Sequence, residues 1–212
     1  MVRFAIPAEC SQSDSRQVAD LYELPKQFFF LPNQFWKHKN HECVIRALSI
    51  AKNRGKEIVI AVSGKQLDSR DETYFPQLKK MVESLGVMDN FRMLGVIPYQ
   101  HIAALMLSSS ALVNPSTFEG WSTTVEEAKS LGVKMLLSDL NVHKEQAAQY
   151  ADFFDPNSPE KLAELLLNFQ LIPEEEKLAL QIQAQEISDK RVAEYAKVFV
   201  DLVELTIMTR GK

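Results

Sequence analysis

The sequence predicts an α/β fold, a Rossmann-like parallel sheet of about six strands with helices on both faces and a long C-terminal helical tail. Three observations predict it. Short apolar runs alternate with segments of helical period along residues 28–172. The apolar runs are continuous, which is typical of strands that are buried on both faces. Residues 173–208 keep a helical composition without another strand.

Each expected strand is a short apolar run bounded by a turn residue. Residues 28–31 form the first, and Pro32 ends it. The other strands are expected at residues 57–62, 91–95, 111–114, 134–138 and 151–154.

The expected helices carry apolar residues at helical spacing and end at glycine or proline. They are residues 42–53, 75–85, 99–107, 123–131 and 159–169. Ser158 can cap the last of these, with Pro159 at its first position. The tail is expected as helix over 173–208, with a break near Ser188.

These elements divide the chain into three segments. Residues 1–27 are polar and rich in serine, and we expect a linker or loop there. Residues 28–172 hold every expected strand, and we expect them to form one Rossmann-like domain. Residues 173–212 are expected as a helical extension packed on the same domain.

Composition excludes several classes of protein. A formal charge of -4 and a pI near 5.7 argue against nucleic acid as a partner. No apolar run reaches the roughly 20 residues that a membrane span needs, and the N-terminus lacks a signal peptide's pattern. Cys10 and Cys43 have no metal-type spacing, so we interpret them as reduced thiols in a cytoplasmic protein. The absence of a Gly-x-Gly-x-x-Gly motif argues against a dehydrogenase.

The most informative stretch is residues 111–128, an apolar run, a tight loop and a helix start. Thr123 with Glu126, or Thr124 with Glu127, fits a capping box. A strand, a loop and a helix N-terminus form an anion site, because free backbone N–H groups and the positive end of the dipole point the same way. Gly120 permits close backbone approach there.

Two carboxylates flank that anion site. Glu119 and Glu127 are eight positions apart, which at a helical rise places them up to about 12 Å apart. Glycoside hydrolases need paired carboxylates at about 5–9.5 Å. The wider spacing instead suits two acceptors that bind different hydroxyls of one long ligand, with a phosphate between them. A hydroxyl, a diphosphate and a second hydroxyl describe a nucleotide-sugar.

Residues 119–128, Glu-Gly-Trp-Ser-Thr-Thr-Val-Glu-Glu-Ala, resemble the paired-glutamate segment of family 4 retaining glycosyltransferases, which have the two-domain GT-B architecture. Residues 33–41 resemble the lysine-bearing loop of that family, and Leu94-Gly95 and residues 138–145 resemble later landmarks. The likeness runs from about residue 26 to about residue 167, in the family's order.

The resemblance implies specific roles. Glu119 would contact the donor sugar near the reacting carbon, Glu127 the ribose hydroxyls and Lys39 the diphosphate, so Glu119 and Lys39 are the expected catalytic residues. Asn33 stands where many members carry a second cation, an arginine. Asn33 makes a neutral hydrogen bond there, or another cation substitutes, or the diphosphate is held less tightly.

The other expected donor-binding residues lie in the surrounding loops. Backbone groups of Ser122 and Thr123 would face the diphosphate, and Gly64, Leu94 and Val96 would line the base. Glu126 is expected to face solvent. The set is completed by Gly120, Ser116 and Thr117. No metal is expected, because the family needs none and His38 and His41 lack a third ligand nearby.

The resemblance covers only the donor-binding half of such an enzyme, so we expect a fragment that lacks an N-terminal acceptor-binding domain. Its partners would be a nucleotide-sugar, on UDP or GDP, and a glycan, polysaccharide or lipid-linked acceptor. We expect a hexosyltransferase domain that is inactive by itself, with any association with the inner membrane face made through absent parts. The alternatives are a non-catalytic nucleotide- or sugar-binding module, a sugar-nucleotide epimerase, and a phosphorylase-type enzyme of the same architecture.

Overall fold

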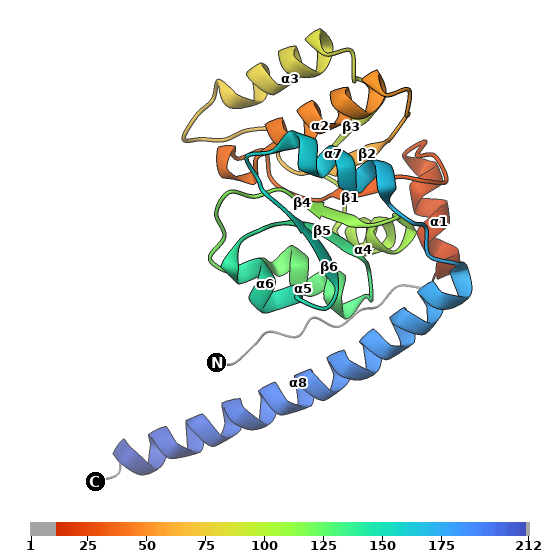
Figure 1. Ribbon diagram of the computed structural model, residues 1–212. Coiled ribbons are helices and arrows are strands. Elements are labelled where there is room, and N and C mark those ends of the chain that lie inside the picture. Colours follow the sequence, from red (N-terminus) through yellow and green to blue (C-terminus); the bar gives the residue numbers. More distant parts are fainter. Residues whose placement is uncertain (1–11, 211–212) are drawn as a thin grey trace.

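A computed structural model describes residues 12–210 of the chain (Figure 1). Strands and helices alternate through most of it. In chain order the elements are α1 (Gln12–Leu21), β1 (Phe29–Leu31), η1 (Lys37–Lys39), α2 (His41–Asn53), β2 (Ile60–Ser63), α3 (Tyr74–Ser84), β3 (Phe91–Gly95), α4 (Tyr99–Ser108), β4 (Leu112–Asn114), α5 (Thr123–Ser130), β5 (Met135–Ser138), α6 (Asn141–Ala147), β6 (Ala151–Phe154), α7 (Pro159–Asn168) and α8 (Glu174–Arg210).

The strands form a 6-stranded sheet in the order β3-β2-β1-β4-β5-β6. Every pairing is parallel. β1 pairs with β2 on one side and with β4 on the other, so the strand order reverses between β1 and β4. In open α/β sheets, ligands bind beyond the carboxyl ends of the strands at such a switch point. The predicted fold class is confirmed.

Both faces of the sheet are covered, and β1 shows why its sequence is uniformly apolar. Phe30 points into the core shared with α1, α4, α5 and α6. Phe29 and Leu31 point into the opposite core, shared with α2, α3 and α7. Successive strand residues alternate between faces, so a strand between two helix layers needs apolar residues at every position. Figure 1 shows these two layers of helices on either side of the strands.

Two α-helices of the described residues were not predicted. Residues 12–21, within the expected linker, form α1, and α1 packs against α4 with Ala19 fully buried. Its polar composition hides a narrow apolar face, which is why the sequence suggested a loop. Residues 1–11 of that expected linker lie outside the described residues. The other missed helix, α6, has only 7 residues and is too short to display a period.

The tail is one helix, α8, with no break at Ser188, contrary to the prediction. Ser188 is 1% exposed, because it faces the domain rather than solvent. Gly132 allows this packing: its φ is 66°, and a Cβ there would lie 2.7 Å from the carbonyl oxygen of Leu180. Further along, Val198, Phe199 and Leu202 are exposed, and Figure 1 shows α8 running past the sheet. Ala184 and Ser188, the buried residues in the described part of α8, lie in its first half.

Two smaller predictions concern cysteines and membranes. Cys43 is free and buried, and burial raises its pKa to about 12. Cys10 lies outside the described residues. Among the described helices, none has the length and apolar character of a membrane span.

Candidate functional site

The loops after β1 and β4 meet at the carboxyl edge of the sheet. The backbone N–H of Thr117 donates to the carbonyl of His38 at 2.8 Å. Asn40 adopts a left-handed conformation and donates its side-chain amide to the carbonyls of Pro115 and Pro156 at 3.0 and 2.9 Å. These bonds fix the end of η1, and with it Lys39, against the turn that carries Glu119.

Lys39 and Glu119 form a direct ion pair. Lys39 Nζ lies 2.7 Å from Glu119 Oε1, and the two side chains are 12% and 8% exposed. The hydroxyl of Ser116 lies 2.7 Å from the same carboxylate oxygen. Burial raises the pKa of Glu119, but the hydrogen bond and charge of Lys39, with Ser116, outweigh it and the pKa is lowered. The two residues expected to be catalytic therefore meet, 80 positions apart in sequence, and Glu119 is ionised.

Asn114 at the end of β4 links the two loops from beneath, a role that the sequence did not indicate. Its Oδ1 accepts from the amide of Asn33 at 3.2 Å and from the backbone N–H of Ser116 at 3.3 Å. Its own amide donates to the hydroxyl of Ser122 at 3.2 Å. Asn33 is only 4% exposed. Its amide therefore supports the loop from inside, through a neutral hydrogen bond to Asn114.

Ser122 is the residue that caps α5, rather than Thr123 or Thr124. Its Oγ accepts from the backbone N–H of Val125 at 3.4 Å. Its own N–H, which we expected to face a diphosphate, donates to Gln146 at 3.2 Å instead. Among the described residues, the N–H groups of Thr123 and Thr124 have no acceptor, as is usual for the first turn of a helix. The free amides thus begin one residue later than predicted.

Glu127 lies on the first turns of α5 and is half-buried. It accepts a hydrogen bond of 2.9 Å from the hydroxyl of Tyr99. Burial raises the pKa of Glu127, and the bond from Tyr99 offsets only part of that rise. Tyr99 is 61% exposed and opens α4, shortly after Leu94 at the end of β3 and Val96 in the loop that follows. Tyr99 was not among the predicted site residues, although an aromatic residue just after Pro98, near an expected base site, was a usable signal.

Glu126 does not face solvent, contrary to the prediction. It is 1% exposed and contacts Arg191 of α8, Lys129 of α5 and Gln146 of α6. Glu126 therefore points toward α6 and α8. Lys129 lies one turn further along the same face.

Gly64 and Gly120 serve different purposes. Gly64 has a φ of 148°, and a Cβ there would overlap the carbonyl of Asn33 and lie 2.9 Å from Gln34 Cα. Gly64 therefore permits close contact with the backbone of the loop after β1. A Cβ at Gly120 would meet nothing within 4 Å, so the space above that turn is open.

A hollow of about 650 Å³ opens beside the Lys39 loop. Lys37, His38, Arg70 and Thr117 are among the residues that line it. Arg70 pairs with Asp68, whose pKa is lowered to about 2 chiefly by that hydrogen bond. The hollow brings two cationic side chains next to Thr117 and the turn, together with the carboxylates of Glu42, Asp68 and Asp71.

The described residues contain no cluster of three or more His, Cys, Asp and Glu side chains that could hold a metal ion. His41 is fully buried and stacks on Phe35 with a centroid distance of 4.3 Å. Burial lowers the pKa of His41 to about 3, so the ring is neutral.

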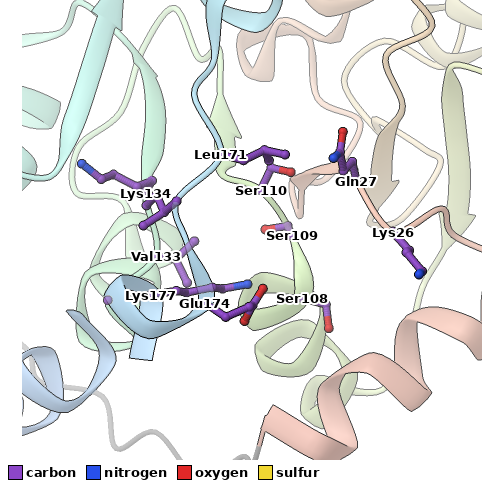
Figure 2. Close-up of a pocket in the computed structure, with 12 residues that line it drawn as sticks. Lys26, Gln27, Ser108, Ser109, Ser110, Val133, Lys134, Leu171, Glu174 and Lys177 are labelled. Atoms are coloured by element: carbon purple, nitrogen blue, oxygen red, sulfur yellow. The ribbon is translucent and has the colours of Figure 1, made fainter. Parts of the chain in front are cut away.

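A second pocket, of about 220 Å³, lies at the opposite edge of the sheet. Figure 2 shows Lys26, Ser109 and Lys134, which come from the segments that precede β1, β4 and β5, together with Lys177 of α8. It is therefore at the amino ends of the strands, remote from Glu119 and Glu127.

Comparison with known proteins agrees with this geometry. The family model of glycosyl transferases group 1 matches residues 11–190, so the chain belongs to that family. No curated protein matches the chain.

Three solved structures illustrate the likeness in fold. HepE of Anabaena, solved with UDP-glucose, is 18% identical to this chain, with a TM-score of 0.75. The match covers 93% of this chain and 54% of the HepE chain. Sucrose-phosphate synthase of Thermosynechococcus elongatus is 15% identical with a TM-score of 0.66, covering 97% and 52%. WaaG, a glycosyltransferase involved in lipopolysaccharide biosynthesis, is 19% identical with a TM-score of 0.63, covering 83% and 47%. The chain thus spans about half the length of these structures.

Proposed function

We propose that the chain is the donor-binding half of a retaining glycosyltransferase that moves a hexosyl group from a nucleoside diphosphate sugar to an acceptor hydroxyl. The observation that carries the proposal is the ion pair of Lys39 with Glu119, which lies beside the open start of α5 at the switch point of the sheet. A cation, an acceptor and a helix N-terminus meet there, as a sugar diphosphate requires.

The diphosphate would lie over the first turn of α5. The free N–H groups of Thr123 and Thr124 point out of that turn, and the open space at Gly120 gives room for phosphate oxygens. Lys39 adds a full positive charge next to them. These groups would stabilise the negative charge that grows on the departing diphosphate, and they need no reorganisation to do so.

The two glutamates would bind the groups on either side of the diphosphate. Glu119, held ionised by Lys39, would accept hydroxyls of the donor sugar and stabilise positive character at its anomeric carbon. Glu127 would accept ribose hydroxyls, with Tyr99 beside it. Leu94 at the end of β3 and Val96 in the loop before Tyr99 would line the base. The assignment to a retaining mechanism is supported by the resemblance of residues 119–128 alone.

The rest of the site would come from another domain. Because the chain spans about half of the structures that it matches, an N-terminal acceptor-binding domain would supply the opposite wall, with a glycan, polysaccharide or lipid-linked acceptor. No metal takes part in the proposed chemistry. HepE was solved with UDP and with UDP-glucose, which favours uridine over guanosine as the base to test first.

Isothermal titration of UDP, GDP and ADP into the folded chain tests the proposal. We expect weak binding with one clear preference among the three, and at least about tenfold weaker binding by Lys39→Met, since a cation–phosphate hydrogen bond is lost. The chain alone is expected to transfer no sugar. The absence of heat with all three nucleotides, from protein with a normal unfolding transition, would overturn the proposal.

A further inference from the structure

The start of α5 is tied to the long helix α8 by a buried carboxylate. Arg191 of α8 donates to Oε2 of Glu126 at 2.7 Å, and Lys129 contacts the same oxygen at 2.9 Å. A buried charge is tolerated only where charges and hydrogen bonds compensate it. Burial raises the pKa of Glu126, but the bonds from Arg191, Lys129 and Gln146 outweigh it, so the pKa is lowered and the carboxylate is ionised.

Gln146 of α6 extends this contact to the turn before α5. Its Nε2 donates to Glu126 Oε1 and to the carbonyl of Ser122, both at 3.0 Å. Its Oε1 accepts from the N–H of Ser122 at 3.2 Å. The two donors of a primary amide and an acceptor site on its oxygen are thus all used. Reversing the amide would turn its donors toward an N–H and its oxygen toward two acceptors, so the bonds define one orientation of Gln146.

Ser122 in turn sets the direction of the free amides. It is the cap of α5, and the N–H groups of Thr123 and Thr124 follow it directly. Any rotation of Ser122 would re-aim both. The cluster of one carboxylate with Arg191 and Lys129 also carries a formal charge of +1, so the buried Glu126 does not oppose an anion at this helix start.

We infer that α8 sets the geometry of the diphosphate-binding turn through the contacts of Arg191 with Glu126, Glu126 with Gln146, and Gln146 with Ser122. Glu126, Gln146 and Arg191 are positioning residues of that site. The inference rests on the proposed function for the identity of the ligand, whereas the link from α8 to the turn can be measured without one. It makes nucleotide affinity depend on how α8 is docked.

Two disruptive variants test the link by different means. Arg191→Leu removes the contact from α8 together with a positive charge, and Arg191 makes further contacts that this change also alters. Gln146→Leu leaves every charge in place and removes only the bonds to Glu126 and Ser122. Arg191→Lys restores the charge with a shorter reach. The matched control is Lys161→Leu, which breaks an exposed pair with Glu164 on α7.

Two measurements are made on each folded variant at a temperature where unfolding is negligible. Amide hydrogen exchange of the peptide that spans residues 118–125 reports the turn, and titration with UDP, GDP and ADP reports affinity. We expect Gln146→Leu and Arg191→Leu to speed exchange in this peptide and to weaken nucleotide binding, each on the order of tenfold. Arg191→Lys should lie between them and the unaltered chain, and Lys161→Leu should change neither quantity.

The outcomes separate the inference from the proposed function. The inference is overturned if both disruptive variants lose stability evenly elsewhere but show unchanged hydrogen exchange at residues 118–125. The contacts among Arg191, Glu126 and Gln146 would then have a purely structural role. Weaker binding with unchanged exchange in the turn also contradicts it. Faster exchange in the turn, together with no nucleotide binding by the unaltered chain, supports the link from α8 and refutes the proposed function instead.

Discussion

Replacing Lys39 by methionine should destabilise the chain at neutral pH, because Glu119 would stay buried without its cation. The two side chains are 12% and 8% exposed, so solvent screens the pair little. Removing one partner of a buried pair costs about 3–5 kcal/mol. We take the lower end, about 3 kcal/mol, because Ser116 still contacts the carboxylate. For a chain of this size that lowers Tm by roughly 6–12 °C.

The sign of the pH dependence makes this prediction specific. In the unaltered chain the pKa of Glu119 lies below its ordinary value of 4.5. The pair therefore adds stability above that value, and the addition is lost as the pH falls through the lowered pKa. In Lys39→Met, burial of Glu119 is no longer offset by Lys39, so the pKa of Glu119 should rise. Acid then protonates the carboxyl, which removes the unpaired buried charge and restores part of the lost stability. The difference in stability should therefore be largest near pH 7 and shrink toward pH 4.

Urea unfolding, followed by circular dichroism between pH 4 and pH 8, measures that difference. Glu119→Gln in the Lys39→Met background should recover most of the loss, because the uncompensated charge is gone. Lys161→Met, at an exposed pair with Glu164, is the control and should change stability by less than about 0.5 kcal/mol. A coupling below about 0.5 kcal/mol between Lys39 and Glu119, or a penalty that is independent of pH, would refute the reasoning.

Three further predictions concern single positions. His41→Phe should keep the ring stack, and the variant should lose about 2 kcal/mol less stability than the unaltered chain between pH 8 and pH 5. The reason is that a histidine with a folded pKa of about 3 and an unfolded pKa of 6.5 opposes folding increasingly as the pH falls below 6.5. Unfolding curves that show the same loss of stability between the two pH values in both proteins would exclude this. Gly64→Ala should lower the free energy of unfolding by about 3 kcal/mol, because the added Cβ would overlap a backbone carbonyl, whereas Gly120→Ala should leave the urea midpoint almost unchanged. Equal urea midpoints for the two variants would show that the backbone at Gly64 has room for a side chain. Nucleotide affinity should fall in mild acid, at a pH above the ordinary pKa of a glutamate, because the pKa of Glu127 is raised and the neutral carboxyl accepts hydrogen bonds from hydroxyls poorly. Glu127→Gln should abolish this pH dependence of the affinity. If the pH dependence persists in the variant, another group causes it.

The fold was predictable because each strand is buried on both faces, and continuous apolar runs mark such strands in any sequence. The meeting of Lys39 with Glu119 was predictable only through the family's order of landmarks, since nothing local connects residues 80 positions apart. The helices α1 and α6 could not be predicted, because α1 is mostly polar and α6 has only 7 residues.

The polar supports of the site escaped prediction for a different reason. Gln146 and Arg191 act through partners 24 and 65 positions away, and neither lies in a motif. Glu126 was misplaced because its inward direction goes with Arg191 and Gln146, which lie 65 and 20 positions away in the sequence. A charged residue on a helical face beside Val125 and Ala128, both fully buried, was the available sign that Glu126 faces inward.

The central claim is that the turn after β4 receives a diphosphate between Glu119 and Glu127. Titration of isotopically labelled protein with UDP and with GDP, followed by amide NMR signals, tests it most directly. We expect the largest shifts at Gly120, Thr123 and Thr124, with smaller ones at Lys39. Shifts confined to the opposite edge of the sheet, around Ser109 and Lys134 in the pocket of Figure 2, would contradict it.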